Sequence, residues 1–295
     1  MATLYTQQSK NIQKTWLLVG VFLAVILGLG YFLSVYYNNP DILVFAFIFS
    51  LVMNIASFWF SDKIALASAR AVPADEKDFL ELHRIVENLA ITAGLPKPRV
   101  YVIDDMSPNA FATGRNKEHA AVAVTTGLLQ ILDRSELEGV IAHELAHIGN
   151  RDILLQSVVV VLVGFLSLVA DMFLRSMFWG RGDSDDRKGG GVLAIVGVVF
   201  LILSPLIGQL IQLAISRKRE FLADATGALL TRYPEGLANA LKKISSAGIP
   251  LSHANDATAH LYISNPFGGK AYSGLHKLFM THPPVEDRIK ALLNK

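Results

Sequence analysis

The chain has 295 residues, of which 52% are hydrophobic and only 18% are charged. Soluble globular domains carry about 25% charged residues, so this composition excludes an ordinary soluble protein, and its aliphatic content excludes a disordered chain. Lysine and arginine outnumber aspartate and glutamate by 27 to 25, which leaves no basic excess for binding nucleic acid. The absence of cysteine excludes disulfides, thiolate metal sites and cysteine nucleophiles.

Four long apolar segments are predicted to cross a lipid bilayer, since about 20 apolar residues span its hydrocarbon core. They cover residues 15–40, 42–61, 153–170 and 189–216. The first pair, joined by a short turn, predicts a transmembrane hairpin within residues 1–61, and its length argues against a cleavable signal peptide. The second pair predicts another hairpin over residues 153–216, although a helical hairpin buried in a soluble core is an alternative for it.

The basic residues beside these segments predict their orientation, because lysine and arginine concentrate on the cytoplasmic side. Lys10 and Lys14 precede the first segment, Lys63 and Arg70 follow the second, and three consecutive basic residues follow the fourth. We therefore expect both termini and the stretch between the hairpins in the cytoplasm. The loop between the third and fourth segments also carries three basic residues, but three aspartates accompany them.

Residues 62–152 have the pattern of a soluble α+β segment. The predicted elements are a helix over 75–93 that ends at Gly94, strands over 100–103 and 120–125, and a helix from Asp133 or Ser135. Each of the last two residues is followed three positions later by a glutamate, the capping-box pattern that begins a helix. This helix should extend through Arg151, from where it can continue directly into the third apolar segment. Residues 217–295 are predicted to be mostly helical.

The second of these helices carries the sequence HELAH over residues 143–147. Two histidines four residues apart lie on one helical face, so both imidazoles can reach one metal ion. A carboxylate beside the first histidine can take a proton from a water activated by zinc, which is the chemistry of peptide hydrolysis. The alternative is a helix whose histidines face solvent, but the apolar neighbours Val140, Ile141 and Ile148 argue against it.

A catalytic zinc site needs a third protein ligand and an open fourth position. Glu220 and Asp224, just after the fourth apolar segment, share a helical face. Glu220 can therefore bind the metal while Asp224 orients a ligand imidazole; the alternative is a surface charge cluster with Arg219. If Glu220 is the ligand, the 73 residues that separate it from His147 make the second hairpin an insertion within the catalytic domain.

Three segments together resemble the HtpX-type membrane metalloproteases, relatives of the CAAX prenyl endopeptidases: HELAHIGNRD, RKREFLADATGA and THPPVEDRI. The resemblance covers nearly the whole chain. It implies that His143, His147 and Glu220 bind one zinc ion, as in the gluzincins. It also implies that Glu144 is the general base and that Asp224 supports the first histidine. Together with the apolar segments, it predicts a mainly α membrane protein with four transmembrane helices and a discontinuous α+β, zincin-like cytoplasmic protease domain with a small sheet.

The resemblance gives candidate roles to further residues. The segment from Asn109 to Gly114 matches the stretch that precedes the substrate-binding edge strand, where an extended peptide can pair its backbone; Asn109 is otherwise a turn residue after a proline. His282 lies in a His-Pro element that the family places near the site, where it can stabilise the oxyanion, and Arg288 can do similar work or hold the loop. A helix N-terminal stop is the alternative for this His-Pro sequence.

These observations predict a multi-pass zinc endopeptidase of the bacterial plasma membrane whose active site faces the cytoplasm. Its expected substrates are polypeptides, in particular misfolded or damaged membrane proteins cleared in a stress response, and its other partner is the lipid bilayer. The sequence leaves the oligomeric state open. One alternative is a prenyl-protein processing protease of the same clan, although those enzymes generally have more spans. Another is a non-proteolytic membrane scaffold with a structural zinc, for which the sequence offers no obvious fourth ligand.

Overall fold

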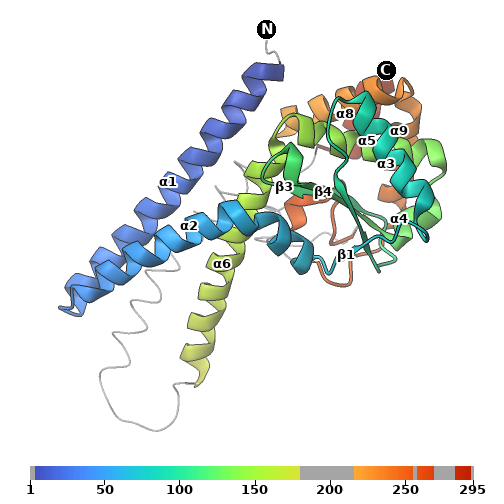
Figure 1. Ribbon diagram of the computed structural model, residues 1–295. Coiled ribbons are helices and arrows are strands. Elements are labelled where there is room, and N and C mark those ends of the chain that lie inside the picture. Colours follow the sequence, from blue (N-terminus) through green and yellow to red (C-terminus); the bar gives the residue numbers. More distant parts are fainter. Residues whose placement is uncertain (1–3, 180–215, 255–257, 269–282, 294–295) are drawn as a thin grey trace.

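The structure begins with two long helices that form a hairpin. The computed structural model describes residues 4–179, 216–254, 258–268 and 283–293. Helix α1 (Leu4–Tyr36) and helix α2 (Asp41–Ser68) lie side by side and extend away from the rest of the protein (Figure 1). Asn38 in the turn between them has a φ of 50°, and the side chain of Asn39 accepts a hydrogen bond from the backbone N–H of Asp41. This turn matches the predicted link between the first two apolar segments.

Beyond the hairpin, the described helices surround a small sheet. They are α3 (Leu80–Thr92), α4 (Thr126–Ile131), α5 (Arg134–Gly149), α6 (Asp152–Trp179), α8 (Arg217–Thr231), α9 (Pro234–Ala247) and α10 (Val285–Leu293), with short 3₁₀ turns η1 (Lys117–His119) and η2 (Ala259–Leu261). Helix α3 begins later than the predicted residue 75, because the Asp75 carboxylate accepts the backbone N–H of Lys77 in a preceding turn. It ends where Gly94 takes a φ of 65°. The capping box predicted for α5 is present at Asp133.

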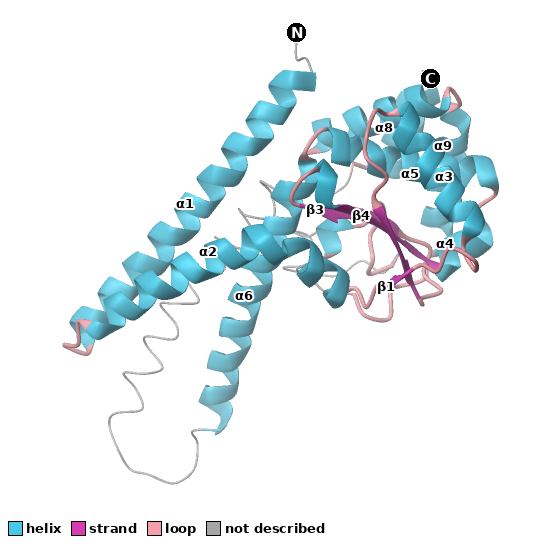
Figure 2. Cartoon of the chain, viewed as in Figure 1, coloured by secondary structure: helices cyan, strands magenta, loops and turns pink. Residues whose placement is uncertain are grey.

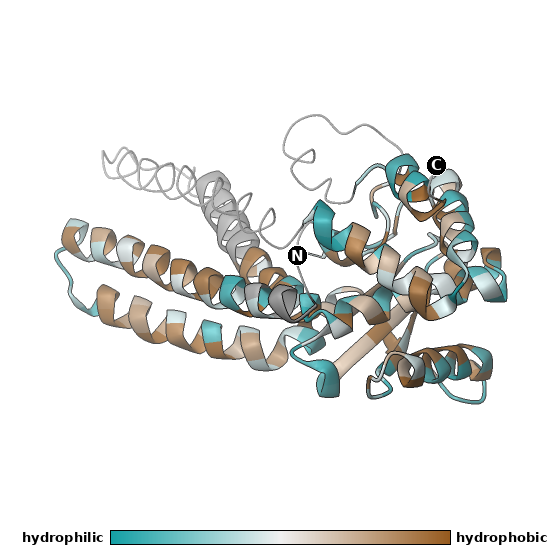
Figure 3. Cartoon of the chain, turned by 90° about the horizontal axis from the view of Figure 1, so that it is seen from above, coloured by the Kyte–Doolittle hydropathy of each residue, from teal (hydrophilic) through white to brown (hydrophobic). Residues whose placement is uncertain are grey.

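Both helices of the N-terminal hairpin are long and apolar enough to cross a membrane. The qualifying stretches are Asn11–Tyr36 and Asp41–Ser68, and apolar residues follow both helices along their length (Figure 3). The first two predicted spans are therefore confirmed as candidate membrane helices. Within the described residues, a third crossing is found only if α5 and α6 together count as one bent span. The fourth predicted segment, 189–216, lies outside the described residues apart from its last residue.

A small mixed sheet lies at the centre of the remaining protein (Figure 2). Its strands are β1 (Val72–Pro73), β2 (Arg99–Ile103), β3 (Ala110–Gly114) and β4 (Ala120–Thr125), in the order β1-β2-β4-β3. Strands β2 and β4 are parallel, whereas β1 and β3 pair antiparallel with their neighbours. Because side chains alternate between faces, Val122 and Val124 join a core with α3 and α5, and Ala121 and Ala123 join one with α2 and α6. Both faces of the sheet are thus covered by helices.

The predicted continuation of α5 straight into the third apolar segment is wrong. Helix α5 ends at Gly149, Arg151 takes a left-handed φ of 58°, and α6 leaves at 85° to α5. A left-handed residue other than glycine costs roughly 1–2 kcal/mol, so other contacts must hold the bend. Some come from α1, where the Asn11 side chain donates to the backbone O of Asn150 at 3.1 Å and to Asp152 Oδ1 at 2.6 Å.

The first half of α6 is enclosed by protein. Leu155, Val159 and Leu162 are buried against Leu18 and Phe22 of α1. The opposite side of α6 packs on β3. Helix α6 thus joins the N-terminal hairpin to the sheet, and this half of it is buried between them.

Candidate metal centre

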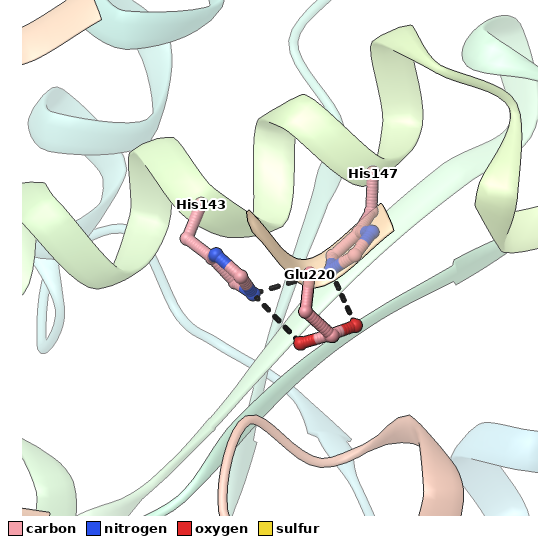
Figure 4. A group of neighbouring side chains, drawn as sticks. All are labelled: His143, His147 and Glu220. Carbon is pink, nitrogen blue, oxygen red and sulfur yellow. Dashed lines mark hydrogen bonds and ion pairs between the residues drawn. The ribbon is translucent and has the colours of Figure 1, made fainter. Parts of the chain in front are cut away.

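Two helices bring the predicted site residues together. His143 and His147 lie one turn apart on α5, whereas Glu220 lies in the first turn of α8. The helices pack closely because Gly227, two turns after Glu220 on the same face of α8, has no side chain. A Cβ at that position would lie 3.0 Å from the backbone N of His143. This close approach places the Glu220 carboxylate beside both imidazoles (Figure 4).

The donor atoms of these three side chains have the spacing of a metal site. Nε2 of His143 lies 3.1 Å from Nε2 of His147, and the nearest Glu220 carboxylate oxygens lie 3.8 and 3.6 Å from these two nitrogens. Ligand atoms about 2.0–2.1 Å from zinc in a tetrahedron are about 3.3 Å from one another. The observed distances bracket this value, and all three side chains are buried. The residues present therefore fit a zinc ion.

A carboxylate beside each imidazole determines which ring nitrogen faces the site. Nδ1 of His143 lies 2.9 Å from Asp224 Oδ1, an ion-pair contact rather than a well-aligned hydrogen bond. Nδ1 of His147 lies 3.0 Å from Asp152 Oδ2. Such a partner keeps the proton on Nδ1 and leaves Nε2 able to bind a metal ion. Asp224 thus lies beside the first histidine. Asp152, five residues beyond the HELAH motif, was not predicted to lie beside the second.

Further residues hold these two carboxylates in place. Arg288 is fully buried and donates Nε and Nη2 to the two oxygens of Asp224, at 2.8 and 2.6 Å. Asp152 Oδ1 accepts the Asn11 hydrogen bond from α1 and also lies 3.3 Å from Nε of Arg219. Of the two roles considered for Arg288, these contacts favour a positioning one. The sequence offered no signal for Asn11, which is 141 residues from its partner.

Glu144 follows the first histidine on α5 and is only 1% exposed. Burial raises the pKa of Glu144 to about 7, although the nearby His147 charge opposes the increase. The backbone of Ala112 in β3 lies near this carboxylate and favours its charged form. A carboxylate with a pKa near neutrality can both accept a proton and return it during one reaction cycle.

The two imidazoles differ in their affinity for protons. Burial lowers the pKa of His143 to about 4, although the neighbouring Asp224 opposes the decrease. Burial also disfavours the charged form of His147, but its hydrogen bond to Asp152 and the charges of Glu220 and Asp152 outweigh this and raise its pKa to about 9. Because a metal ligand must be deprotonated, an ion that binds here has to displace a proton from His147.

Asn109 lies directly before β3, at the edge of the sheet, so the segment 109–114 is largely the edge strand itself and not the stretch before it. The Asn109 side chain is buried, and it donates to the backbone O of Ser264 at 3.0 Å and accepts the backbone N–H of the same residue at 3.3 Å. It thereby anchors the segment after η2 to β3. His282, the other candidate, lies outside the described residues.

Comparison with known proteins agrees with this geometry. Residues 76–295 match the family model described as peptidase family M48. The chain belongs to peptidase family M48. Two relatives, each named Protease HtpX homolog, extend the likeness over the N-terminal hairpin. The protein from Thermoanaerobacter pseudethanolicus is 50% identical, covering 98% of this chain and 97% of its own length, and the protein from Pyrococcus furiosus is 47% identical, covering 95% and 94%. This M48 protein is therefore a membrane metalloprotease, as the HtpX-type resemblance predicted.

A solved structure, that of Ste24p from S. mikatae, has a similar fold. It matches with a TM-score of 0.51 and 19% identity, covering 98% of this chain and 67% of that one. At this identity the likeness concerns the fold alone. It agrees with a mainly helical M48 protein that has a small mixed sheet.

Proposed function

We propose that this M48 protein is an endopeptidase that holds one zinc ion between His143, His147 and Glu220 and uses Glu144 as its general base. The observation that carries the proposal is the convergence of three buried ligand atoms within 4.8 Å of one another. Structural zinc sites are usually closed by four protein ligands. In the described part of the chain, three side chains come close enough to bind one ion. A fourth position is therefore left for water or substrate.

Zinc held there supplies Lewis acidity, which polarises a peptide carbonyl and lowers the pKa of water to about 7. Glu144 accepts the proton of the attacking water and passes it to the leaving amine, a cycle that suits its pKa near neutrality. Asp224 and Asp152 hold the two imidazoles so that Nε2 of each faces the metal. The reaction requires no covalent link between enzyme and substrate. His282 remains our candidate for a group that stabilises the oxyanion.

The outer edge of β3 is the proposed binding surface for the substrate backbone. Near the ends of the strand, the backbone O of Ala110 and the backbone N–H of Gly114 already bond to other parts of the protein. Ala112 lies between them on the same edge, near Glu144. An extended polypeptide that pairs with Ala112 adds a strand to the sheet and places its scissile bond beside the general base. Asn109 contributes by fixing the start of this strand.

The protein is further proposed to cross the plasma membrane of a bacterium four times, with both termini and the active site in the cytoplasm. In this arrangement residues 1–61 and 153–216 form hairpins, and residues 62–152 and 217–295 form one catalytic domain. The lysine and arginine bias beside the spans supports this orientation. Because Asn11, in the first candidate span, contacts the residues that orient a metal ligand, the active site lies close to the membrane surface. Misfolded or damaged membrane proteins reach such a site, which fits a role in stress-related quality control.

Processing of prenylated proteins is the second candidate, because the fold resembles that of Ste24p, a relative of the CAAX endopeptidases. The two candidates differ in substrate but share the site. Cleavage of a farnesylated C-terminal peptide in preference to an unfolded membrane protein would select this alternative.

The test is cleavage of an unfolded membrane protein by the full-length, zinc-loaded protein in detergent, beside Glu144→Gln. Removal of the base while the three ligands remain should abolish turnover but retain the metal. Glu138→Gln is the matched control, since Glu138 lies on the same helix but pairs with Arg134 at the surface. Equal cleavage by both variants would refute the role of Glu144. Retention of zinc without cleavage of any tested polypeptide by the wild type would favour the scaffold alternative.

A further inference from the structure

A cavity of about 480 Å³ lies where α2 leaves its apolar stretch and meets the sheet. Its volume falls within the range of about 300–1,000 Å³ that is usual for small-molecule sites. Trp59 and Phe60 line it, each half exposed at the end of the uncharged segment 42–61. Aromatic residues at this position are typical of the boundary between hydrocarbon and headgroups. The cavity therefore lies at the end of α2 that we expect at the membrane surface.

The acidic residues of this cavity are largely compensated. Asp62 is buried and pairs with Arg99 at 2.5 Å, and the exposed Glu118 lies 3.9 Å from Lys117. The remaining strong cations of the lining are Lys63 and Arg115. Within the described part of the chain, neither of these has a carboxylate partner.

Lys63 and Arg115 are instead held by aromatic and backbone groups. The Lys63 ammonium lies 5.6 Å from the centre of the Phe60 ring, and the Arg115 guanidinium lies 4.7 Å from that of Trp59. Arg115 also donates one long hydrogen bond, 3.4 Å, to the backbone O of Trp59. A guanidinium has five donors and an ammonium has three, so most of these donors stay available to a ligand in the cavity.

We propose that this cavity binds the phosphate headgroup of an anionic lipid. Two uncompensated cations that share a cavity suit a phosphate, which accepts several charge-assisted hydrogen bonds. The two aromatic rings suit the apolar part of the same molecule, since they lie at the level where acyl chains begin. Anionic lipids are concentrated at that surface, which favours a lipid over a phosphate from solution. A bound headgroup there would link α2 to the loop after β3, next to the proposed substrate edge.

The test uses the full-length protein in mixed micelles and measures binding of fluorescent phosphatidylglycerol. Each Lys or Arg near a membrane surface contributes about 1 kcal/mol to anionic lipid binding. Lys63→Gln with Arg115→Gln should therefore weaken binding about 25-fold, and Lys63→Gln alone about fivefold. The control, Lys242→Gln with Lys290→Gln, removes the same charge from exposed positions on α9 and α10 and should leave affinity unchanged. Because Lys63 is exposed, its single variant tests the site even if Arg115→Gln disturbs packing on Trp59.

Several outcomes would overturn the proposal. Equal affinity for zwitterionic phosphatidylcholine would exclude recognition of an anion, and an equal loss in the control variant would indicate general attraction to the micelle. Inorganic phosphate that binds as tightly as the lipid would assign the cavity to a soluble anion. A polyglutamate peptide that binds more tightly than phosphatidylglycerol, and loses this affinity in the double variant, would assign it to an acidic polypeptide.

Discussion

Asn11 provides the sharpest test of the link between the N-terminal hairpin and the metal centre. Its side chain is 2% exposed and donates at 2.6 Å to the carboxylate that holds Nδ1 of His147. A hydrogen bond to a charged group contributes about 1.5–3 kcal/mol. After Asn11→Ala, Asp152 Oδ1 would keep the contact with Nε of Arg219 at 3.3 Å.

The expected consequence of Asn11→Ala is weaker zinc binding. Loss of groups that orient metal ligands costs about 10–100-fold in affinity, and we expect the lower end, about tenfold, because Arg219 remains. Tenfold corresponds to about 1.4 kcal/mol, which is close to the value of the lost hydrogen bond. The assay is competition for zinc against a chelator in detergent, together with thermal unfolding of the metal-free protein.

Thr15→Val is the matched control for this experiment. Thr15 lies one turn further along α1, is equally buried, and donates to the backbone O of Asn11 at 2.9 Å. Its substitution removes a buried hydrogen bond without touching the carboxylate. Unchanged zinc affinity in Asn11→Ala, or an equal loss in Thr15→Val, would refute the reasoning.

Three further predictions concern the helices of the site. Asp224→Asn should weaken zinc binding about 10–100-fold, measured by the same competition; full affinity would show that the His143 imidazole is oriented without it. Gly227→Ala should destabilise the fold by about 1–3 kcal/mol in thermal unfolding, because the added Cβ meets backbone atoms of α5. Gly20→Ala is the control, since a Cβ at Gly20 meets no other atom and should not destabilise the fold. Equal effects of the two substitutions would contradict the packing argument. Asp133→Ala should cost about 1 kcal/mol, since it removes the α5 cap. The backbone N–H of Glu136 holds the pKa of Asp133 below its usual value, so the wild type should lose this contribution as the pH falls below about 4. In Asp133→Asn the side chain caps the helix but does not titrate, so this variant should not lose stability in that pH range. An identical pH dependence of stability in the wild type and Asp133→Asn would contradict the prediction.

The residues that converge at the candidate metal site could be predicted from sequence, because the chemistry imposes a local spacing. Two histidines four residues apart must share a helical face, and the same rule placed Glu220 with Asp224. The partners of these residues follow from tertiary packing, for which a single sequence carries no signal. Asn11 therefore emerges only from the structure, 141 residues from the carboxylate that it holds. Arg288 was a candidate from the resemblance, but its pairing with Asp224, 64 residues away, was not predicted.

The errors in the predicted elements also have physical causes. The bend between α5 and α6 falls in the polar sequence Gly-Asn-Arg-Asp over residues 149–152, which was wrongly assigned to the helix. The left-handed conformation of Arg151 is stabilised by distant contacts, which the sequence does not show. Strand β3 was not predicted as a strand, because residues 110–114 contain one β-branched residue, Thr113, whereas residues 120–125 contain three.

The division of the centre between α5 and α8 has a consequence for the newly made protein. The ribosome releases the histidines well before the glutamate, and the intervening chain includes α6, which has to dock against the N-terminal hairpin. Until α8 packs against α5 across Gly227, the nascent polypeptide has only two of its three ligands near one another. With the proposed ligand set, the complete site would therefore form only after α8 has packed against α5, and hydrolysis would begin only at that stage.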